Sequence, residues 1–138
     1  MAAYNKFNQF VEDMAEKVHN LQSDAITCAL TATANAPVAT NSILGNLTQI
    51  SYTNLSSRVF TVTTAAQSSG TYTWLLADLV LTASGGSVAA FQYVVIYNDT
   101  PTSPADPLIG WYDYGSALTL ANTETLTIDF TTSTFTIA

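Results

Sequence analysis

The segment VAAFQYVVIY, residues 88–97, is apolar on both of its faces and rich in β-branched and aromatic side chains. Such residues favour strands, and an apolar run of this length is typical of a strand covered on both sides. A Gly-containing tight turn, 84–87, precedes it, and a loop with three prolines, 98–107, follows it. We therefore expect residues 88–97 to form a central strand of a sheet.

Outward from this segment, hydrophobicity with a period of two continues over most of the chain. In the segment 25–33, Ile26, Cys28 and Leu30 alternate with threonines and an alanine, which indicates a half-buried strand. Further strands are expected at residues 59–64, 71–82 with a bulge at 75–76, 108–112, 117–120, 125–130 and 135–137, the last two as a hairpin. Residues 38–57 are expected as a long loop with one short strand near 47–52.

About eight short strands separated by frequent turns predict a mainly β protein. The fold class that we expect is a two-sheet antiparallel β-sandwich, jelly-roll-like or immunoglobulin-like, with the jelly roll favoured. No linker divides the chain, so residues 1–138 are expected as a single domain with the sandwich at about 25–138.

The N-terminal segment has a different period. Its apolar residues recur at helical spacing and its charged residues lie on the other side; the apolar set is Phe7, Phe10, Val11, Met14, Val18 and Leu21. This pattern predicts one α-helix over about residues 4–21, with Asn5 as its N-cap.

The apolar stripe of this helix, carried by Phe7, Phe10, Val11 and Met14, must be buried somewhere. It can pack against the end of its own sandwich, or it can pack against a second chain in a two-fold contact. We expect these four residues to contribute to a partner interface, and we expect a homo-oligomer, with a dimer favoured.

Charge excludes two classes of partner. The net charge is −7, and Lys6, Lys17 and Arg58 are the basic residues. Binding to phosphates requires clustered cations, so we expect neither a nucleic-acid partner nor an anionic membrane surface. The N-terminus lacks the basic and apolar regions of a secretion signal, and the longest apolar runs are too short to span a bilayer.

The residues that could carry chemistry are few. His19 is the one histidine, and neither a nucleophile elbow nor a phosphate-binding glycine loop is present in the sequence, so no catalytic residue is expected. Cys28 is expected as a buried small hydrophobe. The three loop acids Asp99, Asp106 and Asp113 match no calcium-loop spacing, so solvated acids are favoured over a calcium site. We expect no metal and no cofactor.

An aromatic set raises one binding possibility. Tyr72, Trp74, Trp111, Tyr112 and Tyr114 could form a platform on which sugar rings stack, since such sites combine exposed rings with nearby acids or amides. The alternative, which we favour, is that these rings belong to the core and rims of the sandwich.

Several motifs carry a resemblance to a known group of proteins. They are YNKFNQFVED (4–13), EKVHNL (16–21), PVATN (37–41), TASGG (82–86), VIYND (95–99) and PLIGWYDYG (107–115). With these, nearly the whole chain resembles small structural proteins of tailed phages and prophages, which we associate with capsid decoration, or cement, proteins. The resemblance implies a non-enzymatic virion protein that binds and stabilises the outside of the phage head shell. The implied partner is the major capsid protein, and the implied location is the capsid exterior after synthesis in the host cytoplasm.

Two other functional classes stay open. One is a receptor- or carbohydrate-binding module of a phage tail or head fibre, which would use the aromatic set. The other, less favoured, is a hydrolase that depends on His19. The sequence identifies neither the host nor the residues that contact a capsid.

Overall fold

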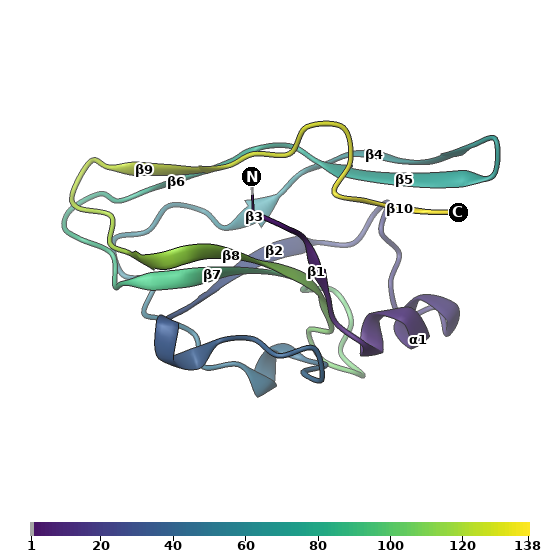
Figure 1. The fold of residues 1–138 in the computed structure, drawn as a ribbon, viewed down its shortest axis with the longest axis horizontal. Coiled ribbons are helices and arrows are strands. Elements are labelled where there is room, and N and C mark those ends of the chain that lie inside the picture. Colours follow the sequence, from purple (N-terminus) through teal and green to yellow (C-terminus); the bar gives the residue numbers. More distant parts are fainter. Residues whose placement is uncertain (1) are drawn as a thin grey trace.

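The computed structural model describes residues 2–138 and shows a two-layer β-sandwich with one α-helix near its N-terminus (Figure 1). Its helices are α1 (Gln9–Ala15) and two short 3₁₀ helices, η1 (Thr33–Asn35) and η2 (Leu44–Asn46). Its strands are β1 (Asn5–Lys6), β2 (Ile26–Thr31), β3 (Val59–Phe60), β4 (Val62–Ser68), β5 (Thr71–Leu76), β6 (Leu79–Thr82), β7 (Phe91–Asn98), β8 (Leu108–Leu118), β9 (Thr125–Ile128) and β10 (Phe135–Ile137). The predicted fold class, a mainly β antiparallel sandwich with one N-terminal helix, is confirmed.

The larger layer is a five-stranded antiparallel sheet in the order β1-β8-β7-β2-β3. Strand β7 pairs with β8 on one side and with β2 on the other, so the predicted central strand is confirmed, although it begins at Phe91 and not at residue 88. Val94 and Ile96 belong to the core between the layers, whereas Val95 and Tyr97 belong to a second, smaller core on the opposite face of the sheet.

A long connection covers this opposite face. It runs between β2 and β3 through η1 and η2, and its Leu44 and Leu47 pack against the smaller core (Figure 1). All residues of β2 are therefore buried, whereas the alternation of apolar and polar residues predicted a half-buried strand. The short strand expected near 47–52 is reduced to a single bridge between Thr31 and Gln49.

The second layer consists of two separate sheets, β10-β5-β4 and β6-β9. The chain passes from the first to the second through Ala77 and Asp78, and the Asp78 carboxylate accepts a hydrogen bond of 2.7 Å from the Phe130 backbone N–H. The single strand expected at 71–82 is thus two strands in different sheets. The irregularity predicted at 75–76 is present as a register shift: Leu76 is opposite Val62 and Leu75 is opposite Thr64, so the extra residue is Thr63 of the partner strand β4.

The expected hairpin between residues 125–130 and 135–137 is wrong. Strand β9 pairs with β6, and β10 pairs with β5. Between β9 and β10, Phe130 enters the core and the Thr134 hydroxyl accepts a hydrogen bond of 3.1 Å from the Leu76 N–H, so the chain crosses from one sheet to the other.

Early and late strands pair in a nested order. In the larger sheet, β1 pairs with β8 and β2 pairs with β7; in the second layer, β5 pairs with β10 and β6 pairs with β9. This nesting is the jelly-roll-like feature of the fold.

The helix is shorter than the expected span of 4–21. Asn5 and Lys6 are in β1, which pairs with Trp111 and Gly110 of β8, so Asn8 and not Asn5 precedes the helix. At the other end Lys17 adopts a left-handed backbone with φ of 66°, which ends the helical turn. Val18 and Leu21 therefore lie after the helix and not within it. Leu21 reaches the core from a turn. No helix among residues 2–138 is long and apolar enough to span a bilayer.

Candidate functional site

The structure separates the four residues expected at a partner interface. Phe7 and Phe10 are 0% and 5% exposed within the chain itself, whereas Val11 is 54% exposed and Met14 is half-buried. The Phe7 ring lies 4.5 Å from the Trp111 ring in the smaller core. Phe7 and Phe10 therefore pack against their own sandwich, which was the alternative to a contact with a second chain. An interface that uses Val11 and Met14 stays a prediction.

Val11 and Met14 line an apolar groove between α1 and β10, which we call the helix groove. It has a volume of about 760 Å³, and its walls include Tyr4, Phe10, Val11, Met14, Phe135 and Ile137. Ile137, on the edge strand β10 of the second layer, is 43% exposed. Val11 and Ile137, two of the exposed large apolar residues, therefore both lie on this groove. Exposed apolar surface of this kind is a common feature of protein contact sites.

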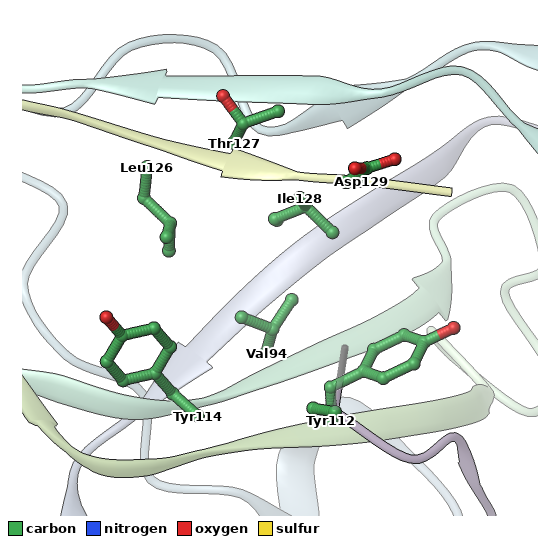
Figure 2. Close-up of a pocket in the computed structure, with 8 residues that line it drawn as sticks. Val94, Tyr112, Tyr114, Leu126, Thr127, Ile128 and Asp129 are labelled. Atoms are coloured by element: carbon green, nitrogen blue, oxygen red, sulfur yellow. The ribbon is translucent and has the colours of Figure 1, made fainter. Parts of the chain in front are cut away.

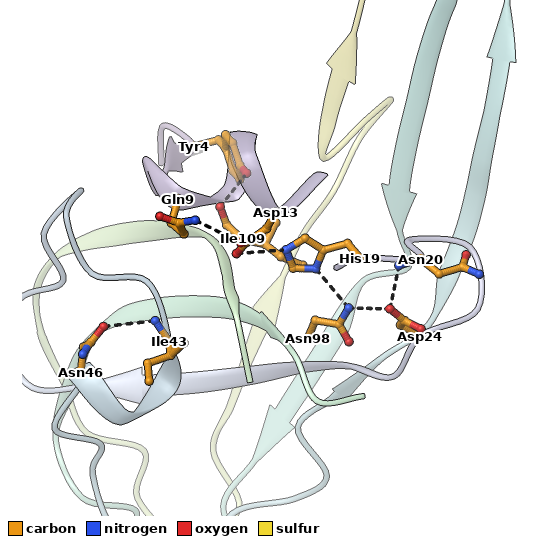
Figure 3. Close-up of polar contacts among 10 residues, drawn as sticks. All are labelled: Tyr4, Gln9, Asp13, His19, Asn20, Asp24, Ile43, Asn46, Asn98 and Ile109. Carbon is orange, nitrogen blue, oxygen red and sulfur yellow. Dashed lines mark hydrogen bonds and ion pairs between the residues drawn. The ribbon is translucent and has the colours of Figure 1, made fainter. Parts of the chain in front are cut away.

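A buried polar network lies beside the helix and includes His19 (Figure 3). The Asn98 side chain lies at its centre: its amide nitrogen is 3.1 Å from His19 Nδ1 and donates to Asp24 Oδ2 at 2.6 Å. The Asn98 amide oxygen accepts from the Thr100 N–H at 3.1 Å. On the other side of the ring, His19 Nε2 lies 4.0 Å from Asp13 Oδ2. The network joins α1, the turn after it and the end of β7.

The network sets the protonation of His19. Because the Asn98 amide nitrogen is a donor, His19 Nδ1 must accept, and the proton of the neutral ring is on Nε2, facing Asp13. Burial lowers the pKa of His19, and the negative charges of Asp13 and Asp24 oppose this effect without overcoming it. The ring is therefore neutral at pH 7.

The surroundings of His19 differ from a catalytic triad. Its two ring nitrogens face an asparagine and an aspartate, and within residues 2–138 no serine, threonine or cysteine side chain is hydrogen-bonded to either nitrogen. The Asp13–His19 pair thus lacks the nucleophile that a hydrolase of this type needs. Its contacts instead tie the segment 13–24 to the sandwich.

The lowered pKa of His19 predicts a loss of stability in mild acid. The unfolded chain binds a proton on this residue near pH 6.5, whereas the folded chain does so only at lower pH. The contribution of His19 to stability is complete above pH 6.5 and is lost as pH falls below it, at no more than about 1.4 kcal/mol per pH unit. Denaturant titrations at pH 7.5 and pH 5.5 should show this loss, and His19→Gln should reduce it. An equal loss in both proteins would contradict the assignment.

The structure also places the remaining titratable residues named above. Cys28 is fully buried on the core side of β2, as expected, and burial raises its pKa to about 12. Burial, and secondarily the charge of Asp99, raises the pKa of Asp106. Asp113 belongs to a different cluster, with Gln92 and Gly115. Within residues 2–138, no three His, Cys, Asp or Glu side chains are grouped as metal ligands.

The aromatic set does not form one platform. Trp74 is fully buried, Tyr72 is on the second layer, and Trp111 packs on Phe7 in the smaller core. Tyr112 and Tyr114, at alternate positions of β8, face the same opening in the side of the sandwich. Strand alternation thus separates Trp111 from its neighbours in the sequence.

This opening, which we call the side cleft, lies between the two layers and has a volume of about 310 Å³ (Figure 2). Val94, Tyr112 and Tyr114 form one wall, and Leu126 and Ile128 of β9 form the other, with Asp129 at the end of β9. Tyr112 is almost fully buried, and burial raises its pKa to about 12, whereas Tyr114 is 52% exposed. The sequence alternation indicated that residues 126 and 128 face inward, but not which strand they face.

A bulge in β8 holds Tyr114 at the cleft. Asp113 is opposite Tyr93 and Leu118 is opposite Phe91, so four residues of β8 bulge against one of β7. Gly115, in the bulge, has a φ of 96°, which glycine adopts without strain. This bulge joins the two strands expected at 108–112 and 117–120 into one.

Side-chain hydrogen bonds fix the bulge. Asp113 Oδ1 accepts from the Gly115 N–H at 2.7 Å and from the Gln92 amide at 2.9 Å. The Thr33 hydroxyl in turn donates to Gln92 Oε1 at 2.7 Å. Bulges of this kind often reorient a side chain near a binding site.

Comparisons with known proteins found no matching family model, no matching curated protein and no matching solved structure.

Proposed function

We propose that this protein is a non-enzymatic structural protein of a virion, a capsid decoration protein that binds the outside of a phage head and stabilises it. The proposal starts from the resemblance of the motifs quoted above to structural proteins of tailed phages. Its partner would be the major capsid protein, and its place the capsid exterior.

The helix groove is the observation that carries the proposal. Val11 and Ile137 are exposed on one apolar groove, in a chain of which only 9% of residues are charged. Apolar surface is stabilised when a partner covers it, and a weakly charged surface around it costs little to desolvate. The polar network of His19 is consistent with a structural role, because its hydrogen bonds join the segment after α1 to the end of β7.

Virion composition tests this function. A decoration protein should be present in tens to hundreds of copies per particle, and quantitative mass spectrometry of purified virions would count them. Particles assembled without it should release their DNA at a lower temperature. Absence from virions, or unchanged heat resistance of heads that lack it, would contradict the proposal.

Matched variants connect the test to the groove. Val11→Asp with Ile137→Asp should abolish binding to heads, whereas Val59→Asp, which changes an equally exposed valine on β3, should bind normally. The same pair of proteins tests the expected homo-oligomer. If a dimer forms through Val11, light scattering should find the groove variant monomeric and the Val59 variant unchanged.

The second candidate is a receptor- or carbohydrate-binding module of a tail or head fibre. The observation that favours it is the ring of Tyr114, which is 52% exposed and lines the side cleft together with the ring of Tyr112 (Figure 2). Such a module should be present in only a few copies per particle, so the same mass spectrometry separates the two functions.

A further inference from the structure

We infer that β4 pairs edge to edge with β4 of a second copy of the chain, as antiparallel strands related by a two-fold axis at Ala66. The second layers of the two copies would then join into one continuous sheet. This surface is separate from the helix groove and from the side cleft. The inference goes beyond the proposed function and does not depend on it, because the pairing is a property of the isolated protein.

Strand β4 has the longest unpaired edge within residues 2–138. Each of the three sheets ends in two edge strands, and β4 has seven residues, whereas the other five edge strands have two to four. A short edge is one of the means by which proteins avoid pairing with other chains. The edge of β6 is also covered, because the Ser56 N–H donates to the Thr82 carbonyl oxygen at 3.0 Å. A long free edge is therefore particular to β4.

Strand β4 also lacks the side chains that usually protect an edge. Charged residues, lysine above all, and proline serve this purpose. The sequence of β4 is VTTAAQS, and neither a charged residue nor a proline occurs between Arg58 and Asp78. The register shift of β4 is confined to its start, between Val62 and Thr64. Two chains of net charge −7 repel each other, so a contact between copies requires a neutral surface of this kind.

The backbone groups of Ala65 and Gln67 point to the free edge. The two-residue turn 69–70 has positive φ at both positions, 50° and 82°, as in a type I′ turn. Such a turn joins a hydrogen-bonded pair, here Ser68 and Thr71. Hydrogen-bonded and non-hydrogen-bonded pairs alternate along antiparallel strands, so the main chains of Gln67 and Ala65 are turned away from β5.

The contacts of β10 agree with this orientation. Trp74 is opposite Ala65, and its carbonyl oxygen accepts a hydrogen bond of 2.7 Å from the Thr134 N–H, just before β10. The backbone groups of Trp74 therefore point to β10 and not to β4. Within residues 2–138, no element beyond the free edge bonds to the main chain of Ala65 or Gln67. Two N–H and two C=O groups of each chain are thus left for a partner.

A second β4 satisfies these groups in one register. With Ala66 opposite Ala66 of the second copy, Ala65 of each chain is opposite Gln67 of the other, and four backbone hydrogen bonds form. Ala66 is then a non-hydrogen-bonded pair with Cα atoms about 4.5 Å apart, a close approach that its small, exposed side chain permits. Thr64 is opposite Ser68, which is a neutral pair. A two-fold contact closes on itself, so the pairing ends at the dimer.

The fold leaves this edge accessible. The hairpin of β4 and β5 extends past the strands of the larger sheet (Figure 1). The side chains of Ala66, Gln67 and Ser68, toward its tip, are exposed. A second chain can therefore reach the edge of β4 without a rearrangement of the sandwich.

Sedimentation velocity of the purified chain measures the pairing. We expect a dimer with a Kd on the order of 10 μM. Ala66→Lys places two ammonium groups at the two-fold axis and should weaken the dimer at least about tenfold. Val80→Lys, which adds the same charge at an exposed position of β6, should dimerise normally. The helix-groove variant, Val11→Asp with Ile137→Asp, should also stay dimeric, and thermal melts would check that each variant is folded.

Cysteine variants test the register. Ala66→Cys should form an intermolecular disulfide with a copper–phenanthroline oxidant, because Cα atoms about 4.5 Å apart fit a disulfide. Ser68→Cys is the matched control: at about 3.3 Å per residue, its two copies lie roughly 13 Å apart in this register, too far to be linked. Cys28 is fully buried and does not interfere.

Three results would overturn the inference. They are a monomer at concentrations up to about 1 mM, a dimer that Ala66→Lys leaves unchanged, and equal cross-linking of the two cysteine variants. Each leaves the proposed function standing, because the copy number in virions is measured independently. A protein that dimerises through β4 but is absent from virions would instead refute the function and keep the pairing.

Discussion

Replacing Trp74 with alanine should lower the free energy of unfolding by about 3–5 kcal/mol, the range for truncation of a large buried aromatic residue. Trp74 is 0% exposed, and its ring lies 5.0 Å from that of Phe135. Its indole N–H donates a hydrogen bond of 2.9 Å to the Leu21 carbonyl oxygen. The substitution therefore opens a cavity and also removes the contact that fixes the turn after α1 to the second layer.

Equilibrium denaturation followed by circular dichroism would measure this effect. Trp74→Phe should lose less, because it keeps most of the ring while removing the indole N–H. Val80→Ala, on the exposed side of β6, should change the free energy of unfolding by less than about 0.5 kcal/mol. A loss below about 1 kcal/mol for Trp74→Ala would show that the second layer does not depend on this contact.

Asn98→Ala should lower the free energy of unfolding by about 2–3 kcal/mol, because a buried polar group left without a partner costs about 1–3 kcal/mol and His19 Nδ1 becomes such a group. Asn98 is 0% exposed and its side chain satisfies three groups at once, those of His19, Asp24 and Thr100. The truncation removes all three contacts together.

The comparison for this substitution is Asn122→Ala. The exposed Asn122 makes a single hydrogen bond of 3.0 Å, to the Gly85 N–H, so its loss should cost less than about 1 kcal/mol. Asn98→Ala should also change the response of stability to pH, because His19 Nδ1 loses its donor and becomes easier to protonate. Equal losses for the two asparagine variants would contradict the central role of Asn98.

The sequence predicted which segments are strands better than it predicted their partners. The double-sided apolar run around Val94 and Val95 was sufficient to identify the central strand. Period two identified Leu126 and Ile128 as inward-facing, but hairpin chemistry at residues 131–134 suggested the wrong partner. Alternation reports the face of a sheet on which a residue lies, whereas pairing depends on distant segments.

The helix shows a related limit. Its stripe from Phe7 to Leu21 has helical spacing, yet only residues 9–15 are helical. Phe7 is buried directly after β1, and Leu21 is buried after the turn at Lys17. A strand, a short helix and a turn can therefore bury apolar residues at the spacing that one long helix would also give. A pattern of burial therefore did not define the ends of the helix.

The sequence analysis identified Val11 and Met14 of the helix groove, and Tyr112 and Tyr114 of the side cleft. It did not identify the strands that complete each site. The helix groove needs β10 beside α1, and the side cleft needs β9 opposite β8. Asp113 was considered only as a possible calcium ligand, whereas its hydrogen bonds fix the bulge. These contacts link residues far apart in the chain, so local spacing contains no signal for them.

The nested strand order has a consequence for synthesis on the ribosome. Strand β2 ends at Thr31, but β7, with which it pairs along its whole length, begins at Phe91, about 60 residues later. At about 5–20 residues per second, translation leaves β2 without that neighbour for roughly 3–12 s. The hairpin of β4 and β5 can form early, but neither layer is complete until β8, β9 and β10 have emerged. The nascent chain must therefore stay unaggregated while it carries an apolar strand, and the sandwich can be completed only after β10 has emerged.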